Sequence, residues 1–162
     1  MNLEYFHPIF VHFPVALTLC GTALLAYGGL RGHADARRAG LMVLVLGGLL
    51  VIPTYITGQV ARAVLEDSSA FERDLPLLDT HEDMGLASLG VLLALGIVAG
   101  IALAKEGTAK DDQKPKPWAL LALALAACAL IALTAFYGGR LVFEHGIGVR
   151  AERDAGRSGS VS

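Results

Sequence analysis

The chain has 162 residues, of which 54% are hydrophobic and 17% are charged, and its formal net charge is -2 at pH 7. Soluble domains usually carry about a quarter of charged residues, so this composition, with a mean hydropathy of +0.57, excludes a soluble globular protein and predicts an integral membrane protein. The near-neutral charge argues against a nucleic-acid partner, and the length suits one domain.

Four apolar runs are each long enough to cross a bilayer, which takes roughly 20 helical residues. They cover residues 9–30, 39–65, 84–104 and 118–143. The links between the runs are short and favour antiparallel neighbours, so the sequence predicts an all-α, up-down-up-down four-helix bundle that spans the lipid bilayer. We expect this transmembrane domain to occupy residues 1–149, followed by a polar flexible tail over 150–162. No internal repeat is apparent.

The helix ends carry ordinary signals. Pro8 suits the first turn of the first helix, where its missing N–H is not needed. Thr80 and Asp83 resemble a capping box and predict that the third helix begins near them. Pro117 predicts that the fourth helix starts no earlier than its own position.

Four of the five histidines converge on one end of the predicted bundle. His7 and His12 open the first helix, His81 opens the third, and His145 follows the fourth, whereas His33 lies in a link at the opposite end. Ionisable groups at the membrane ends of helices are functional candidates by default. The sequence therefore predicts a functional site at this end, the histidine end.

The distribution of basic residues indicates the orientation. Seven of the 13 lysines and arginines lie in the two links at the end opposite the histidines. Short basic links stay in the cytoplasm, so we expect a multi-pass protein of the bacterial inner membrane with both termini and the histidine end outside the cytoplasm.

The residues around the histidines favour haem b over a bare metal ion. Gly85 follows His81 by one helical turn, and Gly138 and Gly139 precede His145, so that glycines leave room for a flat macrocycle. Arg140 is suited to pair with a haem propionate. On the second helix, further hydrogen-bonding groups stand at the same end: Tyr55, Gln59 and Arg62.

The ligands predicted for the iron are drawn from His12, His81, His145 and His7. His12 is preferred to His7 because it lies further into the span, where an unligated imidazole would be more costly to bury. His7 then becomes a partner for a propionate or a proton. One haem is expected, with two as an open alternative. The cysteines, Cys20 and Cys128, lack CxxCH spacing, which excludes covalently attached haem.

Two motifs carry a resemblance to a known family. The segments "HPIFVHFPVAL" and "GGRLVFEHGIGV", of the form HPxxVHFPxAL and GGxLVxxHGxGV, and the histidine in "THEDMG" resemble a bacterial family of predicted four-helix membrane proteins classed as a domain of unknown function. The resemblance covers residues 5–149. It implies four helices, haem binding and a place beside redox proteins.

The function expected from these features is electron transfer by a membrane b-type haem protein rather than stand-alone enzyme activity. Electrons would pass from a membrane donor, with quinol as one candidate, to a redox protein or a respiratory or photosynthetic complex on the outer face. Two alternatives stay open at this point. The histidines could bind or transfer copper or zinc, or the chain could be a structural accessory subunit of a membrane complex.

Overall fold

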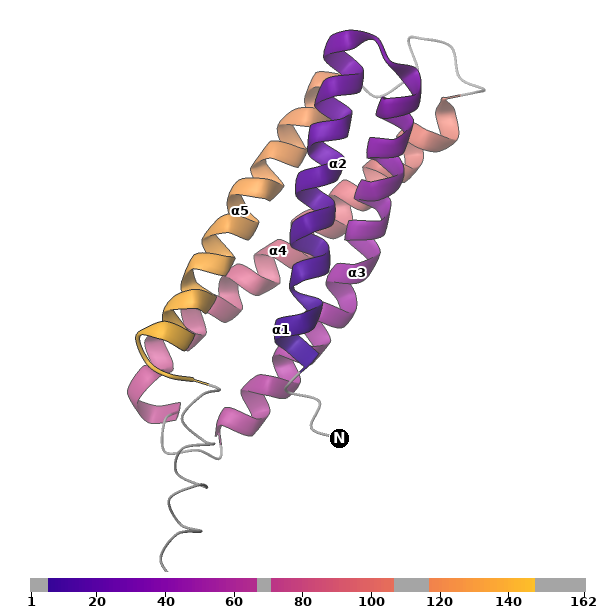
Figure 1. Cartoon of the computed structure of the whole chain (residues 1–162). Coiled ribbons are helices and arrows are strands. Elements are labelled where there is room, and N and C mark those ends of the chain that lie inside the picture. Colours follow the sequence, from indigo (N-terminus) through magenta and orange to yellow (C-terminus); the bar gives the residue numbers. More distant parts are fainter. Residues whose placement is uncertain (1–5, 67–70, 107–116, 148–162) are drawn as a thin grey trace, which may run out of the picture.

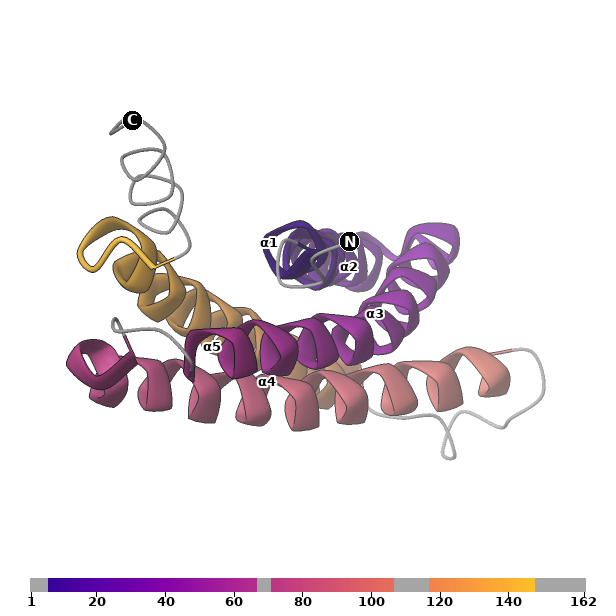
Figure 2. The same ribbon diagram turned by 90° about the horizontal axis from the view of Figure 1, so that it is seen from below.

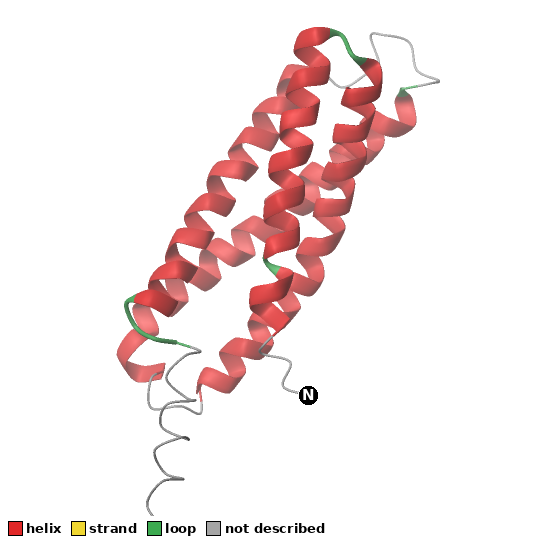
Figure 3. Cartoon of the chain, viewed as in Figure 1, coloured by secondary structure: helices red, strands yellow, loops and turns green. Residues whose placement is uncertain are grey.

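The computed structural model of the chain describes residues 6–66, 71–106 and 117–147; the predicted tail at 150–162 lies outside them. Within these residues there is no strand (Figure 3). The helices are α1 (His7–Phe10), α2 (His12–Arg31), α3 (Ala34–Glu66), α4 (Phe71–Lys105) and α5 (Pro117–Phe143).

Four helical segments are long and apolar enough to cross a membrane: His7–Arg31, Ala34–Glu66, Pro76–Lys105 and Trp118–Phe143. At most 39% of the apolar window of any of them is buried inside the bundle. Large apolar side chains cover the outside, among them Leu30, Leu49, Ile97 and Leu125. A helix satisfies its own backbone groups, so such an exterior suits lipid. The predicted all-α, four-helix membrane protein is confirmed.

The helices run up, down, up and down around the bundle (Figures 1 and 2). Helix α2 packs on α3, α3 on α4, and α4 on α5, while α5 returns to α2 through the smallest of these four interfaces. Helix α1 packs against α3. The view along the bundle in Figure 2 places α1 and α2 diagonally across from α4.

Two helices begin earlier than their hydropathy predicts. Helix α4 begins at Phe71 rather than near Thr80, and the Thr80 hydroxyl donates to the carbonyl of Pro76, 2.8 Å away within the same helix. The predicted capping box is therefore wrong. Helix α3 begins at Ala34. An apolar run marks only the part of a helix that suits lipid. These two helices begin earlier because they include polar residues of the preceding links.

The buried faces of the two hairpins, α2–α3 and α4–α5, follow the same pattern. Between Ser88 and Ala102, every buried residue of α4 lies 74 positions after a buried residue of α2, as Ser88 does after Pro14. Four buried residues of α5 likewise lie 80 positions after buried residues of α3, as Ile131 does after Val51. They are Leu120, Ala124, Ala127 and Ile131. The chain thus contains a structural repeat that the sequence did not reveal.

Equivalent contacts between the two hairpins differ in closeness. A Cβ atom added to Gly48 of α3 would lie 2.9 Å from the carbonyl of Leu92 and 3.0 Å from Cα of Gly96 on α4. The repeat places Cys128 of α5 and Thr22 of α2 at the equivalent positions, and their side chains meet, with Sγ 3.5 Å from Oγ1. Glycines allow two backbones to touch. The α3–α4 contact is therefore close, while side chains separate α5 from α2.

Candidate functional site

The histidine end of the bundle is assembled as the sequence predicts. The start of α1, the end of α3, the start of α4 and the end of α5 all lie at one end (Figure 1). His7, His81 and His145 are half-buried there, His12 is exposed, and His33 lies in the α2–α3 loop at the other end.

His7 is the first residue of α1, and its side chain lies against α3. Its Nδ1 atom is 3.1 Å from the carbonyl oxygen of Thr54 and 3.4 Å from the hydroxyl of Thr57. A backbone carbonyl only accepts, so Nδ1 carries the proton and donates it to this hydrogen bond. In the neutral ring the lone pair is then on Nε2, the atom that remains free to bind a metal.

Helix α3 is shaped to receive this imidazole. A Cβ atom on Gly58 would lie 2.9 Å from Cε1 of His7, so that only glycine leaves space for the ring. The side chain of Thr54 adds a second link, since its hydroxyl reaches the carbonyl of Phe10 at 3.1 Å. Pro14 has no N–H to donate to that carbonyl, four residues earlier in the chain. The threonine hydroxyl, which also lies 2.8 Å from the carbonyl of Leu50 in its own helix, is thus a donor beside a carbonyl that proline leaves without its helical partner.

His81 belongs to α4, and its side chain is held in the same way against α5. Its Nδ1 atom donates to the carbonyl of Thr134 at 3.1 Å, and a Cβ atom on Gly138 would lie 2.9 Å from its Cε1 atom. The Thr134 hydroxyl lies 3.3 Å from the carbonyl of Met84 and 2.9 Å from the hydroxyl of Ser88. Nε2 of His81 thus has the same free lone pair as Nε2 of His7.

Thr54, Thr134 and Gly58 are site residues that sequence reasoning missed. A signal for them exists, because "TYITG" and "TAFYG" both read T-x-x-x-G near the ends of the second and fourth helices. Each threonine is one helical turn before its glycine, on the same face.

His12 and His145 are placed differently from this pair. Nδ1 of His12 bonds to the carbonyl of Pro8, one turn back in its own chain segment, and the side chain is exposed. His145 follows α5, with Nε2 3.9 Å from a carboxylate oxygen of Glu144. The structure therefore brings His7, rather than the preferred His12, into equivalence with His81.

Arg140 forms an ion pair with Glu144 at the end of α5. Its guanidinium bonds to both carboxylate oxygens of Glu144 at 2.9 Å and lies 5.9 Å from the ring centre of Phe136. The hydrogen bonds from Arg140 hold the pKa of the Glu144 carboxyl below its ordinary value. A propionate at this position would compete with Glu144 for the same cation.

The glycines proposed to make room for a macrocycle fall into two groups. Gly138 is covered by the His81 ring. Around Gly85 and Gly139, in contrast, no described atom beyond the adjoining residues and the backbone of the same helix lies within 4 Å of an added Cβ. Open space is therefore present one turn after His81 and directly after Gly138.

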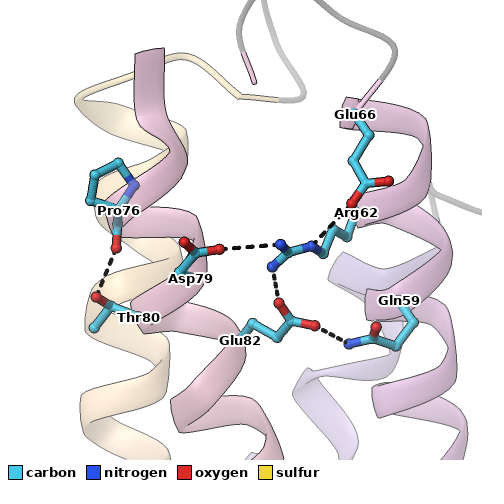
Figure 4. Close-up of polar contacts among 7 residues, drawn as sticks. All are labelled: Gln59, Arg62, Glu66, Pro76, Asp79, Thr80 and Glu82. Carbon is cyan, nitrogen blue, oxygen red and sulfur yellow. Dashed lines mark hydrogen bonds and ion pairs between the residues drawn. The ribbon is translucent and has the colours of Figure 1, made fainter. Parts of the chain in front are cut away.

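Polar side chains join α3 to α4 (Figure 4), and one of them, Glu82, follows His81 in the chain. Arg62 contacts Glu66 at 3.4 Å, Asp79 at 3.1 Å and the carboxylate of Glu82. Gln59 donates to the other oxygen of Glu82 at 3.0 Å. These side chains bond to one another. Tyr55, the other residue predicted here, is half-buried in α3.

No three side chains of His, Cys, Asp or Glu in the described parts of the chain lie close enough together to hold one metal ion. The histidine end instead offers two imidazoles from equivalent places, each with one oriented nitrogen.

Comparison with known proteins gives a family but no individual relative. No curated protein and no solved structure matches the sequence. A family model described as a predicted membrane protein, DUF2231, matches residues 5–151, and the chain belongs to that family.

Proposed function

We propose that this protein is a b-type haem protein of the membrane, in which His7 and His81 hold the haem iron through their Nε2 atoms. The observation that carries the proposal is the repeated hydrogen bond from Nδ1 to a backbone carbonyl, at 3.1 Å in both cases. A ligating histidine almost always donates its other ring N–H in this way, which fixes the tautomer and the ring orientation.

The donor set suits haem better than a bare ion. Two imidazoles complete the coordination of a porphyrin-bound iron, whereas structural zinc takes four protein ligands and catalytic zinc takes three. The described residues offer no such group of three. This favours haem over the copper or zinc alternative. Open space next to Gly85 and Gly139 is compatible with the edge of a macrocycle.

A haem at this place would supply one-electron redox chemistry. The residues of the chain would bind and orient it: the threonine carbonyls fix the imidazoles, and Arg140 can exchange Glu144 for a propionate. We infer that electrons arrive from a membrane-dissolved donor of the quinol type and leave to a redox partner at the histidine end. The basic links at the opposite end support an orientation with this end outside the cytoplasm of a bacterial inner membrane.

The test is an absorption spectrum of the protein purified in detergent, oxidised and then reduced with dithionite. We expect a red protein with the sharp reduced bands of low-spin haem b. His7→Ala and His81→Ala should each lose the low-spin spectrum, because each substitution removes one of the two nitrogen ligands proposed for the iron. His33→Ala, at the far end of the bundle, is the matched control and should keep it. A wild-type protein that stays colourless after incubation with haemin would refute the proposal.

A further inference from the structure

The two hairpins carry the same arrangement of four groups at the histidine end. A histidine at the start of the hairpin donates from Nδ1 to the carbonyl of a threonine in its second helix. The hydroxyl of that threonine reaches the carbonyl three residues after the histidine, which is Phe10 in one hairpin and Met84 in the other. The glycine one turn later lies against the imidazole. The repeat therefore extends from the buried core to the site.

Neither arrangement makes a metal site by itself. Each imidazole is surrounded in its own hairpin by a threonine, a glycine and a backbone carbonyl that already accepts the Nδ1 proton. None of these groups is a second nitrogen or thiolate ligand for iron. Each hairpin thus contributes one oriented lone pair, that of Nε2.

The two lone pairs are related by the way the hairpins pack. Both hairpins leave the histidine end and return to it, so the operation that relates them is an approximate two-fold axis parallel to the helices. The order of the contacts agrees with this axis, since α3 packs on α4 and its equivalent α5 packs, less closely, on α2. A group on such an axis meets His7 and His81 in equivalent ways.

We infer that His7 and His81 are the two halves of one binding site on this axis, and that the chain holds a single haem shared between its two repeats. The inference rests on the proposed function, which already names the two ligands, and adds the number of haems per chain and their place on the axis between the two repeats. It also excludes an arrangement in which each hairpin binds a haem of its own.

The test is the haem content of the full-length protein reconstituted with haemin. Haem is measured by the pyridine haemochrome method and protein by amino-acid analysis, for the wild type, His7→Ala, His81→Ala and the double variant. We expect one haem per chain in the wild type. Each single variant should lose the whole low-spin signal, and the double variant should lose no more than either.

Imidazole rescue separates loss of a ligand from loss of the fold. Adding imidazole to either single variant should restore the low-spin spectrum, because it refills the vacant coordination position, and His12→Ala should match the wild type throughout. Two haems per chain, or single variants that keep half of the low-spin signal, would overturn the shared site while leaving haem binding intact. A protein with no haem at all would instead remove the proposed function.

Discussion

The imidazole of His81 occupies the space in which Gly138 would carry a Cβ atom: such an atom would lie 2.9 Å from Cε1 of the ring. The same distance separates a Cβ atom on Gly58 from Cε1 of His7. These glycines do not relax the backbone, since both lie inside helices. They provide a flat surface on which an imidazole rests while its Nδ1 atom reaches the carbonyl one turn earlier.

Gly138→Ala and Gly58→Ala should therefore displace the imidazoles from their carbonyls. We expect either substitution to weaken haemin binding by about tenfold or more, as loss of a partner that orients a ligand commonly does. Titration with haemin measures the effect. Gly90→Ala is the control, because its methyl group would meet open space on the exposed face of α4 and alanine favours a helix by up to about 1 kcal/mol. Equal affinities for the Gly58 and Gly90 variants would contradict this account.

Thr54→Val should destabilise the fold near the histidine end. Valine keeps the shape but removes the hydroxyl that reaches the carbonyl of Phe10, which Pro14 leaves without a helical donor. Hydrogen bonds between membrane helices are worth roughly 0.6 to 2 kcal/mol, so we expect the free energy of unfolding in detergent to fall by about that amount. Thr54→Ser retains the donor and should recover most of the loss. A valine variant as stable as the wild type would show that the hydroxyl contributes nothing to the fold.

Gly48→Ala should separate α3 from α4. Its methyl group would meet backbone atoms of Leu92 and Gly96, which cannot move aside without moving the helix. Overpacking of this kind costs about 1 to 3 kcal/mol, and thermal unfolding in detergent measures it. Gly100→Ala on α4 would make an ordinary contact of 3.7 Å with Val45 and should leave the midpoint unchanged or raise it.

Arg62→Met should destabilise the protein more than Glu66→Gln. Arg62 is 22% exposed and serves three carboxylates, so its removal leaves Asp79 and Glu82 without a cation between them. We expect a loss of about 1 to 2 kcal/mol, whereas the exposed pair with Glu66 is worth about 0.5 kcal/mol or less. Equilibrium unfolding of both variants gives the comparison. The ranking would be refuted if the Glu66 variant lost more.

The pair of Arg140 with Glu144 predicts a pH dependence. The folded-state pKa of Glu144 is lowered by its hydrogen bonds to Arg140, so its contribution to stability is present above the ordinary carboxyl range. It disappears as the pH falls through the lowered pKa. A carboxyl NMR titration of Glu144 in micelles should give a midpoint below that of a free glutamate. Arg140→Gln should raise this midpoint, and an unchanged midpoint would show that the ion pair is absent in solution.

The sequence by itself determined the membrane class, the four spans and the gathering of histidines at one end. These features follow from hydropathy and chain direction, because a long apolar helix must cross the bilayer and short links force antiparallel neighbours. The same reasoning could not locate helix ends such as Phe71, since polar residues extend a helix beyond the apolar run.

Only the tertiary structure decided which histidine bonds to which backbone carbonyl. The depth of each histidine along the helix favoured His12 as the ligand. Burial, however, depends on which way the side chain points around the helix axis and on what lies opposite it. His7 therefore lies against Gly58, and His12 is exposed. The repeat was hidden for a related reason. Equivalent positions such as Pro14 and Ser88 share burial rather than side-chain identity, because packing between helices constrains the space a residue fills more than its chemistry.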